Sequence, residues 1–281
     1  MLVFEDMKHT HLPTISVCVS VNNEAKRIQE LMESLVGFAD EVIISDTGSL
    51  DDTPAMVEAF IQEGHPNFHL HHYVSVGGFH YGKAKNYAMS KATKDYILVL
   101  DADERLSKDF TDTIKEFLHE HNPDVVKIVR YDDLLPHLVE PIERIVKREK
   151  KIFFGTDDES KVHEFFIHSS KAITFHKPLW HCQREKHWLL RPHSRFFYLG
   201  LEVDRTPKTK SFFGHFLRGL WMFQYKFKKV YFSQRMKQEG LYGFEYAFLR
   251  AVYAFLIQFF VGLKQEDNEY WTTPEYRERI H

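Results

Sequence analysis

An acidic run follows one of the most apolar segments of the chain. Residues 96–100, YILVL, lead directly into Asp101, Ala102, Asp103 and Glu104. If the apolar segment is a strand whose extended backbone continues, side-chain alternation places Asp101 and Asp103 on one side. Two carboxylates at a strand end suit Mg2+ or Mn2+, which also binds substrate phosphates and offsets charge on a departing diphosphate. The alternative is that these acids only favour the start of the next helix.

A second polar cluster follows the apolar segment 41–46 and contains Asp46, Ser49, Asp51 and Asp52. A carboxylate at this point of a nucleotide-binding fold can accept hydrogen bonds from a base or a ribose. Asp51 and Asp52 have a second explanation, because either one can cap the helix that the following TPAMVEAF predicts. The two roles are compatible.

The segment 15–21 is also strand-like, and Asn22, Asn23 and Glu24 come directly after it. Ligands of an α/β sheet bind at the carboxyl ends of its strands, so these side chains are expected near a ligand. A helix N-cap is the alternative role for one of the two Asn residues. It requires no ligand.

A glycine-containing basic loop, residues 77–86, precedes another predicted helix. Its Gly77, Gly78 and Gly82, together with Lys83 and Lys85, could present backbone amides, a helix N-terminus and ammonium groups to an anion. The spacing matches no P-loop. The lysines are equally explained as ordinary surface charge.

The elements that must hold these residues alternate between strand-like and helix-like patterns over about the first 130 residues. After 15–21, for example, Ile28, Leu31, Met32 and Leu35 recur at helical spacing. We therefore expect an α/β fold with a mainly parallel sheet flanked by helices. Such a sheet gathers the polar residues described above at one edge.

The second half of the chain is less regular. A helix is expected near 107–120 and a strand at 124–132, followed by an irregular stretch to about residue 160 and strand-like patterns at 161–168 and 171–182. From 183 onward the pattern is helical, aromatic and basic. We predict a catalytic domain over 1–182 and a helical C-terminal region over 183–281.

Bulk properties limit the choice of function. With 281 residues, 43% of them apolar, the chain can bury a full core, and its net charge of -3 gives no general attraction to nucleic acid. Cys18 and Cys182 have no metal-site spacing, and the first 14 residues contain no apolar run of signal-peptide length. These features predict a cytoplasmic protein that does not bind nucleic acid.

Together the segments ISVCVSVNNEAKRI, EVIISDTGSLDDT, KNYAMSKATKDYILVLDADE and KVHE resemble the family 2 glycosyltransferases of the GT-A, Rossmann-like type. The similarity is strongest to the bacterial branch of WaaE-type lipopolysaccharide-core glucosyltransferases and covers mainly residues 14–110. It implies transfer of a hexose from a nucleotide sugar, with UDP as the nucleotide, to a hydroxyl of a cell-envelope or other glycan or glycolipid. It also implies inversion and a dependence on Mg2+ or Mn2+.

The resemblance assigns roles position by position. The donor would be bound by Asn23, Glu24, Asp46, Asp51, Lys85, Asn86 and Asp101. The metal would be held by Asp101 and Asp103, which makes Asp103 catalytic. Two positions depart from the family pattern, since Leu50 replaces a small hydroxyl residue and Lys85 replaces a common arginine.

An inverting transfer needs a general base for the acceptor hydroxyl. The resemblance at KVHE makes Glu164 the expected base, whereas His163, on the opposite side of an extended strand, is better explained as a structural histidine. The FFGTDDES insertion before this motif is longer than the family link. It supplies Asp157 and Asp158 as alternative bases.

The histidine-rich stretch around His176, His181 and His187 is a source for a third metal ligand, of which GT-A enzymes often have one late in the chain. We predict His181. A surface or core position is the alternative for each of these histidines.

The aromatic and basic C-terminal segment has two explanations. It could form an acceptor groove or bind peripherally to an anionic membrane surface, or its aromatic residues could simply be core at helical spacing. Residues 244–263 have the length of a membrane span but contain Glu245, Arg250 and Gln258, so we expect a buried or peripheral helix.

Two other functions fit parts of the sequence. A sugar-1-phosphate nucleotidyltransferase uses a related sheet, but its glycine-rich basic loop would stand where VNNEAKRI follows the first strand. A non-catalytic GT-A-like module could bind the nucleotide sugar or serve as a scaffold. Asp101 and Asp103 argue against loss of catalysis.

Overall fold

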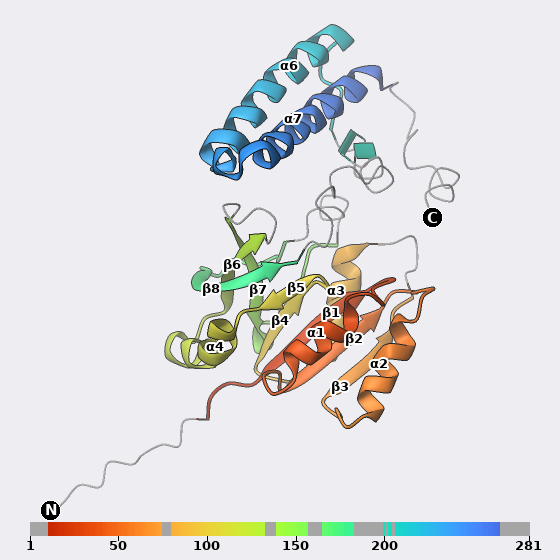
Figure 1. Ribbon diagram of the computed structural model, residues 1–281, viewed down its shortest axis with the longest axis vertical. Helices are drawn as coiled ribbons and strands as arrows, with labels where there is room; N and C mark the ends of the chain where they lie inside the picture. Colours follow the sequence, from red (N-terminus) through yellow and green to blue (C-terminus); the bar gives the residue numbers. More distant parts are fainter. Residues whose placement is uncertain are drawn as a thin grey trace, which may run out of the picture. The chain divides into compact units, whose positions relative to one another are not determined.

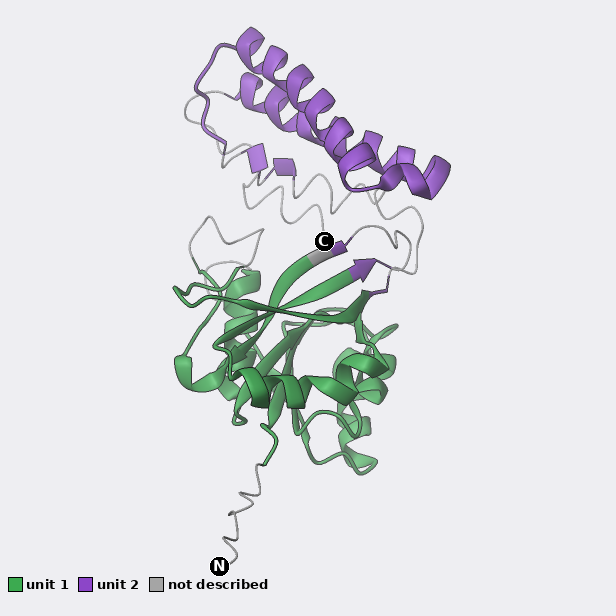
Figure 2. Ribbon diagram, turned by 90° about the vertical axis from the view of Figure 1, so that its left-hand side faces the viewer, with its two compact units in different colours: residues 1–130, 141–180 green, residues 131–140, 181–281 purple. Residues whose placement is uncertain are grey.

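The computed structural model divides the chain into two compact units, residues 1–130 with 141–180 and residues 131–140 with 181–281 (Figure 2). It describes residues 11–74, 80–132, 139–156, 165–182, 199–200, 202–203 and 206–264. The functional division of the chain at residue 182 stays a prediction.

The first unit begins with alternating strands and helices. These are β1 (Ile15–Val21), α1 (Ile28–Leu35), β2 (Glu41–Asp46), α2 (Thr53–Gln62), β3 (Phe68–His72), α3 (Tyr81–Lys91) and β4 (Tyr96–Leu100). They are followed by β5 (Glu104–Leu106), α4 (Lys108–His121), β6 (Val125–Asp132), β7 (Val139–Lys147), the short 3-10 helix η1 (Arg148–Lys150) and β8 (Ile173–His181). The ends of β6, β7 and β8, residues 131–132, 139–140 and 181, are counted with the second unit.

The strands form one sheet in the order β3-β2-β1-β4-β7-β6-β8-β5 (Figure 1). The first four strands in this order are parallel, whereas β7 pairs with β4 in the antiparallel direction. The expected α/β fold, a mixed and mainly parallel sheet flanked by helices as in GT-A proteins, is therefore confirmed.

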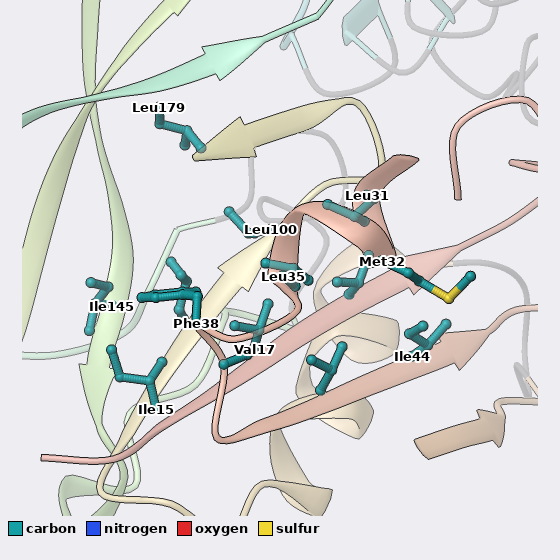
Figure 3. Close-up of a cluster of buried hydrophobic side chains, with 14 of the residues drawn as sticks. Ile15, Val17, Leu31, Met32, Leu35, Phe38, Ile44, Leu100, Ile145 and Leu179 are labelled. Carbon is teal, nitrogen blue, oxygen red and sulfur yellow. The ribbon is translucent and has the colours of Figure 1, made fainter. Parts of the chain in front are cut away.

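Both faces of the sheet are covered by helices because successive strand residues point to opposite faces. Ile15, Val17 and Val19 of β1 pack in the same core as residues of α1, α2 and α4, whereas Cys18 packs in the core of the other face with residues of α3. Figure 3 shows Leu31 and Leu35 of α1 above β1, β2 and β4. The helical spacing found in the sequence is confirmed, because Ile28, Leu31, Met32 and Leu35 are all buried.

β7 was not expected, since the sequence around it was interpreted as irregular. Residues Ile145, Val146 and Lys147 pair with β4, which places an antiparallel strand in the middle of the sheet. The predicted strand at 171–182 is confirmed as β8. Of the predicted strand 161–168, residues 161–164 lie outside the described residues, and Phe166 forms an isolated bridge with Phe154.

The second unit contains an antiparallel helix pair, α6 (Phe212–Lys228) and α7 (Gly240–Leu263), linked by the π-turn η4 (Lys229–Ser233) and the 3-10 turn η5 (Met236–Glu239) (Figure 1). Aromatic rings of the two helices contact each other along the pair. The contacts are Phe212–Phe259, Phe216–Phe255, Phe223–Phe248 and Phe227–Phe244. We call these four contacts the aromatic ladder, and they confirm the aromatic-rich C-terminal helices.

Candidate functional site at the carboxyl edge of the sheet

The carboxyl ends of β1, β2 and β4 lie side by side. Val21 at the end of β1 pairs with Asp46 at the end of β2, and Leu100 at the end of β4 pairs with Val19. The polar residues that follow these three strands therefore share one edge of the sheet, as parallel strands require. This edge is where an α/β sheet binds its ligand.

Asn23 joins the loop after β1 to the loop after β2. Its backbone has a positive φ of 55°, and its side-chain oxygen accepts hydrogen bonds from the amides of Leu50 (2.8 Å) and Asp51 (3.3 Å). Its own amide donates to the hydroxyl of Ser49 at 2.9 Å. The positive φ suits Asn better than most residues, so this position fixes the shape of both loops.

Asp46 is almost fully buried and holds the turn that follows it. Its carboxylate accepts hydrogen bonds from the amides of Gly48 (3.2 Å) and Ser49 (3.1 Å), and Nδ1 of His72 lies 3.5 Å from Oδ2. Asp46, the residue expected to bind the nucleotide base, therefore lies at the carboxyl edge of the sheet. In the structure it organises the loop that follows β2.

Asp51 binds the first residue of α2, whereas the N-cap position itself is occupied by Asp52, whose side chain makes no capping hydrogen bond. The carboxylate of Asp51 accepts from the amide of Thr53 (3.0 Å) and from the amide of Ala25 (3.0 Å), which follows β1. Burial alone would raise the pKa of Asp51, but these bonds and the bond from the Thr53 hydroxyl outweigh it and lower the pKa. Asp51 stays ionised and links the two loops a second time.

The acidic run after β4 forms a turn and does not continue the strand. β4 ends at Leu100, the Glu104 amide donates to the carbonyl of Asp101 (3.0 Å), and the Asp101 amide donates to Oε2 of Glu104 (3.0 Å). Asp101 and Asp103 therefore do not alternate along an extended strand. The expected alternation was wrong, because two local hydrogen bonds close the turn.

Both oxygens of Asp101 are paired with cations. Oδ1 lies 2.8 Å from Nζ of Lys85 on α3, and Oδ2 lies 2.6 Å from Nη2 of Arg144 on β7. Burial opposes ionisation of Asp101, but Arg144 and Lys85 outweigh it and hold the pKa of this carboxyl well below its usual range. Asp101 is a permanent anion whose charge is already compensated.

Glu104 completes this network from inside the protein. It is fully buried, and its Oε1 accepts from Nη2 of Arg144 at 2.7 Å and lies 3.6 Å from Nη1 of Arg130. The sequence interpretation missed Arg144 and Arg130. The only local signal was a basic residue, Arg144, inside the apolar run IERIV, and its partner Glu104 is 40 residues away in the chain.

Negative charge gathers around Glu24. Burial raises the pKa of Glu24, the ion pair with Arg27 (2.9 Å) lowers it, and the nearby carboxylates of Asp103 and Asp51 raise it further. A divalent cation beside Glu24 would reduce the repulsion that Asp103 and Asp51 exert on it. Among the described residues, however, no group of three or more His, Cys, Asp and Glu side chains is arranged to hold a metal ion.

The donor set therefore fits an open metal site better than a closed one. Mg2+ and Mn2+ bind through one or two carboxylates and complete their shells with water and substrate phosphates. Asp103 and Glu24 suit that description. Asp101 suits it less, because Lys85 and Arg144 hold both of its oxygens.

Asn86 has a structural role that the sequence did not suggest. Its amide nitrogen donates to the carbonyl of Phe154 at 2.9 Å, and its amide oxygen accepts from the Phe154 amide at 2.8 Å. The ammonium of Lys85 also lies 5.6 Å from the centre of the Phe154 ring. These contacts fix α3 against the segment that leads toward residues 157–164.

The predicted base lies outside the described residues, and the predicted third metal ligand belongs to the second unit. Glu164, His163, Asp157 and Asp158 lie outside the described residues, as do Gly77, Gly78 and His187. His181 belongs to the second unit, where its Nδ1 lies 3.3 Å from Oδ2 of Asp132. Its assignment as a metal ligand stays a prediction.

Comparison with known proteins connects this edge to a family. The sequence pattern of glycosyl transferase family 2 matches residues 16–183, which include β1 to β8. An uncharacterised glycosyltransferase of Rickettsia felis is 30% identical over 208 residues, which covers 71% of this chain and 67% of the relative. The chain thus spans about two thirds of the length of that relative.

Two further proteins are similar at lower identity. The lipopolysaccharide core biosynthesis glycosyltransferase LpsC of Rhizobium meliloti is 26% identical over 260 residues, covering 87% of this chain and 90% of LpsC. A mannosyltransferase of Pyrobaculum calidifontis, solved with GDP-Man and Mn2+, superposes with a TM-score of 0.49 at 20% identity, covering 70% of this chain and 64% of the other.

Proposed function

This chain belongs to glycosyltransferase family 2, and on that premise we propose that the carboxyl edge of its sheet binds a nucleotide sugar and transfers the sugar to an acceptor hydroxyl. One observation carries the proposal: the strand register brings the loops after β1, β2 and β4 together there, and Asp51 and Asp103 both lie close enough to Glu24 to raise its pKa. A diphosphate and a divalent cation would balance this charge.

Asn23 and Asp46 shape the part of the site that would receive the nucleoside. Their hydrogen bonds to Leu50, Ser49 and Gly48 fix the loop after β2 before a ligand arrives. A loop that is already ordered loses less conformational entropy when the ligand binds, so more of the interaction free energy remains as affinity. Base and ribose are therefore expected to lie against residues 46–51, with Asn23 beneath them.

Asp103 is the proposed metal ligand, with Glu24 beside it. A bound Mg2+ or Mn2+ supplies positive charge to the departing nucleoside diphosphate. Asp101 would contribute indirectly, because its ion pairs with Lys85 and Arg144 fix the turn that carries Asp103 and would hold two cations close to a bound diphosphate.

The transfer itself needs a base for the acceptor. A carboxylate takes the proton of the acceptor hydroxyl as its oxygen forms a bond to the anomeric carbon. At the same time the bond between the anomeric carbon and the diphosphate breaks, and its electron pair leaves with the nucleoside diphosphate. Glu164 remains the proposed base, on the strength of the KVHE motif. Attack opposite the leaving group would invert the anomeric centre.

We propose a cytoplasmic enzyme with a UDP-hexose donor and an acceptor among cell-envelope glycans or glycolipids. The support is the similarity to LpsC, a lipopolysaccharide core enzyme by name, and the motif resemblance to WaaE-type enzymes. His181 as a further metal ligand belongs to the same proposal.

The test is release of nucleoside diphosphate from a panel of UDP- and GDP-sugars with Mn2+, Mg2+ or EDTA. The proposal expects turnover of at least one donor with metal, loss of turnover in Asp103→Asn and Glu164→Gln, and unchanged turnover in Glu33→Gln, an exposed residue of α1. Binding without turnover would identify a non-catalytic module. Release of pyrophosphate from a nucleoside triphosphate and a sugar 1-phosphate would identify a nucleotidyltransferase.

A further inference from the structure

One face of α6 is apolar and exposed. Phe213 (65% exposed) and Trp221 (60% exposed) lie on it together with Leu217, Leu220 and Tyr225. The spacing of four, seven, eight and twelve residues from Phe213 puts all five on one side of a helix. We call these five residues the outer stripe. They alternate with the α6 residues of the aromatic ladder, which face α7.

The helix pair is also strongly basic. Residues 206–264 contain ten Lys and Arg residues but only two acids, Glu239 and Glu245, although the whole chain has a net charge of -3. The positive charge is therefore concentrated in this part of the molecule. A surface that combines apolar bulk with positive charge suits an anionic amphipathic partner.

Basic side chains lie next to the outer stripe. Arg218, Lys228 and Lys229 are exposed on α6 and at its end, and Nζ of Lys229 lies 6.0 Å from the centre of the Tyr225 ring. Burial lowers the pKa of Lys226, and the nearby charges of Arg250 and Lys229 lower it further. Arg250 and Lys229 thus repel Lys226, whereas Glu202 attracts it, and a layer of anions would reduce the repulsion.

We propose that the outer stripe of α6 docks on an anionic lipid bilayer surface, with its aromatic rings at the headgroup–acyl boundary and Arg218, Lys228 and Lys229 against lipid phosphates. Trp and Tyr favour this boundary, and each cation close to an anionic membrane adds electrostatic attraction. The helix pair then lies in the plane of the interface.

The same helix pair could bind lipid in a different way. The helix over Met236–Leu263 is long and apolar enough to cross a bilayer, by length and composition. The four rings that this helix contributes to the aromatic ladder, however, pack on α6. Gln258 is also buried, with its side-chain oxygen 3.0 Å from Nδ1 of His215 on α6. Crossing a bilayer would place Arg250 and Glu245 in or near the hydrocarbon, so surface docking is the proposed arrangement.

The experiment uses the full chain without donor or metal, so its outcome does not depend on transfer activity. Vesicles of phosphatidylcholine alone are compared with vesicles of phosphatidylcholine and phosphatidylglycerol in equal parts, by co-sedimentation at low and high salt. We expect the protein to bind the anionic vesicles at low salt and to be released from them at high salt. Trp221→Glu and Phe213→Glu should each weaken binding by about tenfold, the loss of one buried aromatic contact.

Controls separate docking from general effects. Val36→Glu adds the same charge at an exposed apolar residue of the first unit and should leave binding unchanged. Brominated lipid should quench the fluorescence of the bound protein, and Trp221→Phe should remove most of that quenching. Circular dichroism must show that every variant is folded.

Three results would overturn the proposal. The first is absence of binding to either kind of vesicle by the folded protein. The second is equal, salt-resistant binding to both kinds, which would point to insertion of α7. The third is concentration-dependent self-association that Trp221→Glu abolishes while vesicle binding is absent, which would make the outer stripe a protein interface.

Discussion

Arg144 lies on β7 and Asp101 in the turn that follows the neighbouring antiparallel strand β4, and Nη2 of Arg144 is 2.6 Å from Oδ2 of Asp101. The same nitrogen is 2.7 Å from Oε1 of the fully buried Glu104. One guanidinium thus holds both ends of the acidic turn. It connects the antiparallel strand β7 to the predicted metal-binding residues.

Replacing Arg144 by Met should destabilise the protein by about 3–5 kcal/mol, because Glu104 would keep a buried charge with Arg130 as its remaining partner at 3.6 Å. Urea unfolding followed by circular dichroism measures the loss. Lys150→Met is the matched control, since the Lys150–Asp124 pair is partly exposed and should be worth less than about 1 kcal/mol. Equal effects of the two variants would contradict the role given to Arg144.

Asn23 should tolerate Gly better than Ala. Both variants lose the oxygen that accepts from the Leu50 and Asp51 amides, but Ala also places a Cβ in the left-handed conformation at φ 55°. Ala should therefore be less stable than Gly by about 1–2 kcal/mol. Differential scanning calorimetry or urea unfolding checks the difference. If Ala is as stable as Gly, the left-handed conformation at this position is wrong.

Cys18 should be unreactive in the folded protein. It is buried between the sheet and α3, and its burial, followed by the charge of Glu41, raises the pKa of its thiol. In a Cys182→Ser background, iodoacetamide should modify Cys18 only after unfolding. Modification of the native protein at a rate typical of a free thiol would contradict this assignment.

The same thiol gives a pH dependence with a definite sign. In the unfolded chain it ionises near pH 8.5, whereas in the folded protein it stays protonated. Its contribution to stability is therefore complete below about pH 8.5 and falls as pH rises above it, because the unfolded state then binds fewer protons. Unfolding free energies at several alkaline pH values should show a shallower fall in Cys18→Ala than in the parent protein.

Replacing Gly82 by Ala should destabilise the protein, although the replacement of Gly by Ala usually stabilises a helix. Ala in place of Gly within a helix normally gains about 1 kcal/mol. At Gly82 of α3, however, an added Cβ would collide with the backbone carbonyl of Gly155. Gly82→Ala should therefore destabilise the protein and weaken donor binding through Lys85, whereas Ser90→Ala, on the exposed side of α3, should change stability by less than about 0.5 kcal/mol. Urea unfolding compares the two.

The first half of the fold could be predicted because its signals are local. Periodic apolar residues such as Ile28 and Leu31 identify α1, and continuous apolar runs identify β1, β2 and β4. The strand β7 was not predicted, because the charged residues Glu143 and Arg144 interrupt its apolar run. Its pairing with β4 depends on contacts between segments about 50 residues apart.

The sequence predicted at which edge of the sheet the candidate site lies, but not the contacts that its side chains make. The sheet rule placed Asn23, Asp46, Asp51 and Asp101 at one edge, and the strand register confirms that the loops meet there. Sequence alone did not indicate that the side chain of Asn86 would bind the Phe154 backbone or that Asp101 would pair with Arg144. Such contacts depend on side-chain directions that residue spacing does not encode.

Binding of nucleoside diphosphates is the most direct test of the central claim, that the edge formed after β1, β2 and β4 is a metal-assisted nucleotide-sugar site. Isothermal titration calorimetry with UDP and GDP, with Mn2+ and with EDTA, should show saturable binding of at least one nucleotide with Mn2+, lost in Asp103→Asn and kept in Glu33→Gln. If the folded protein binds neither nucleotide with or without Mn2+, or if Asp103→Asn binds as well as the parent protein, the proposed site is wrong.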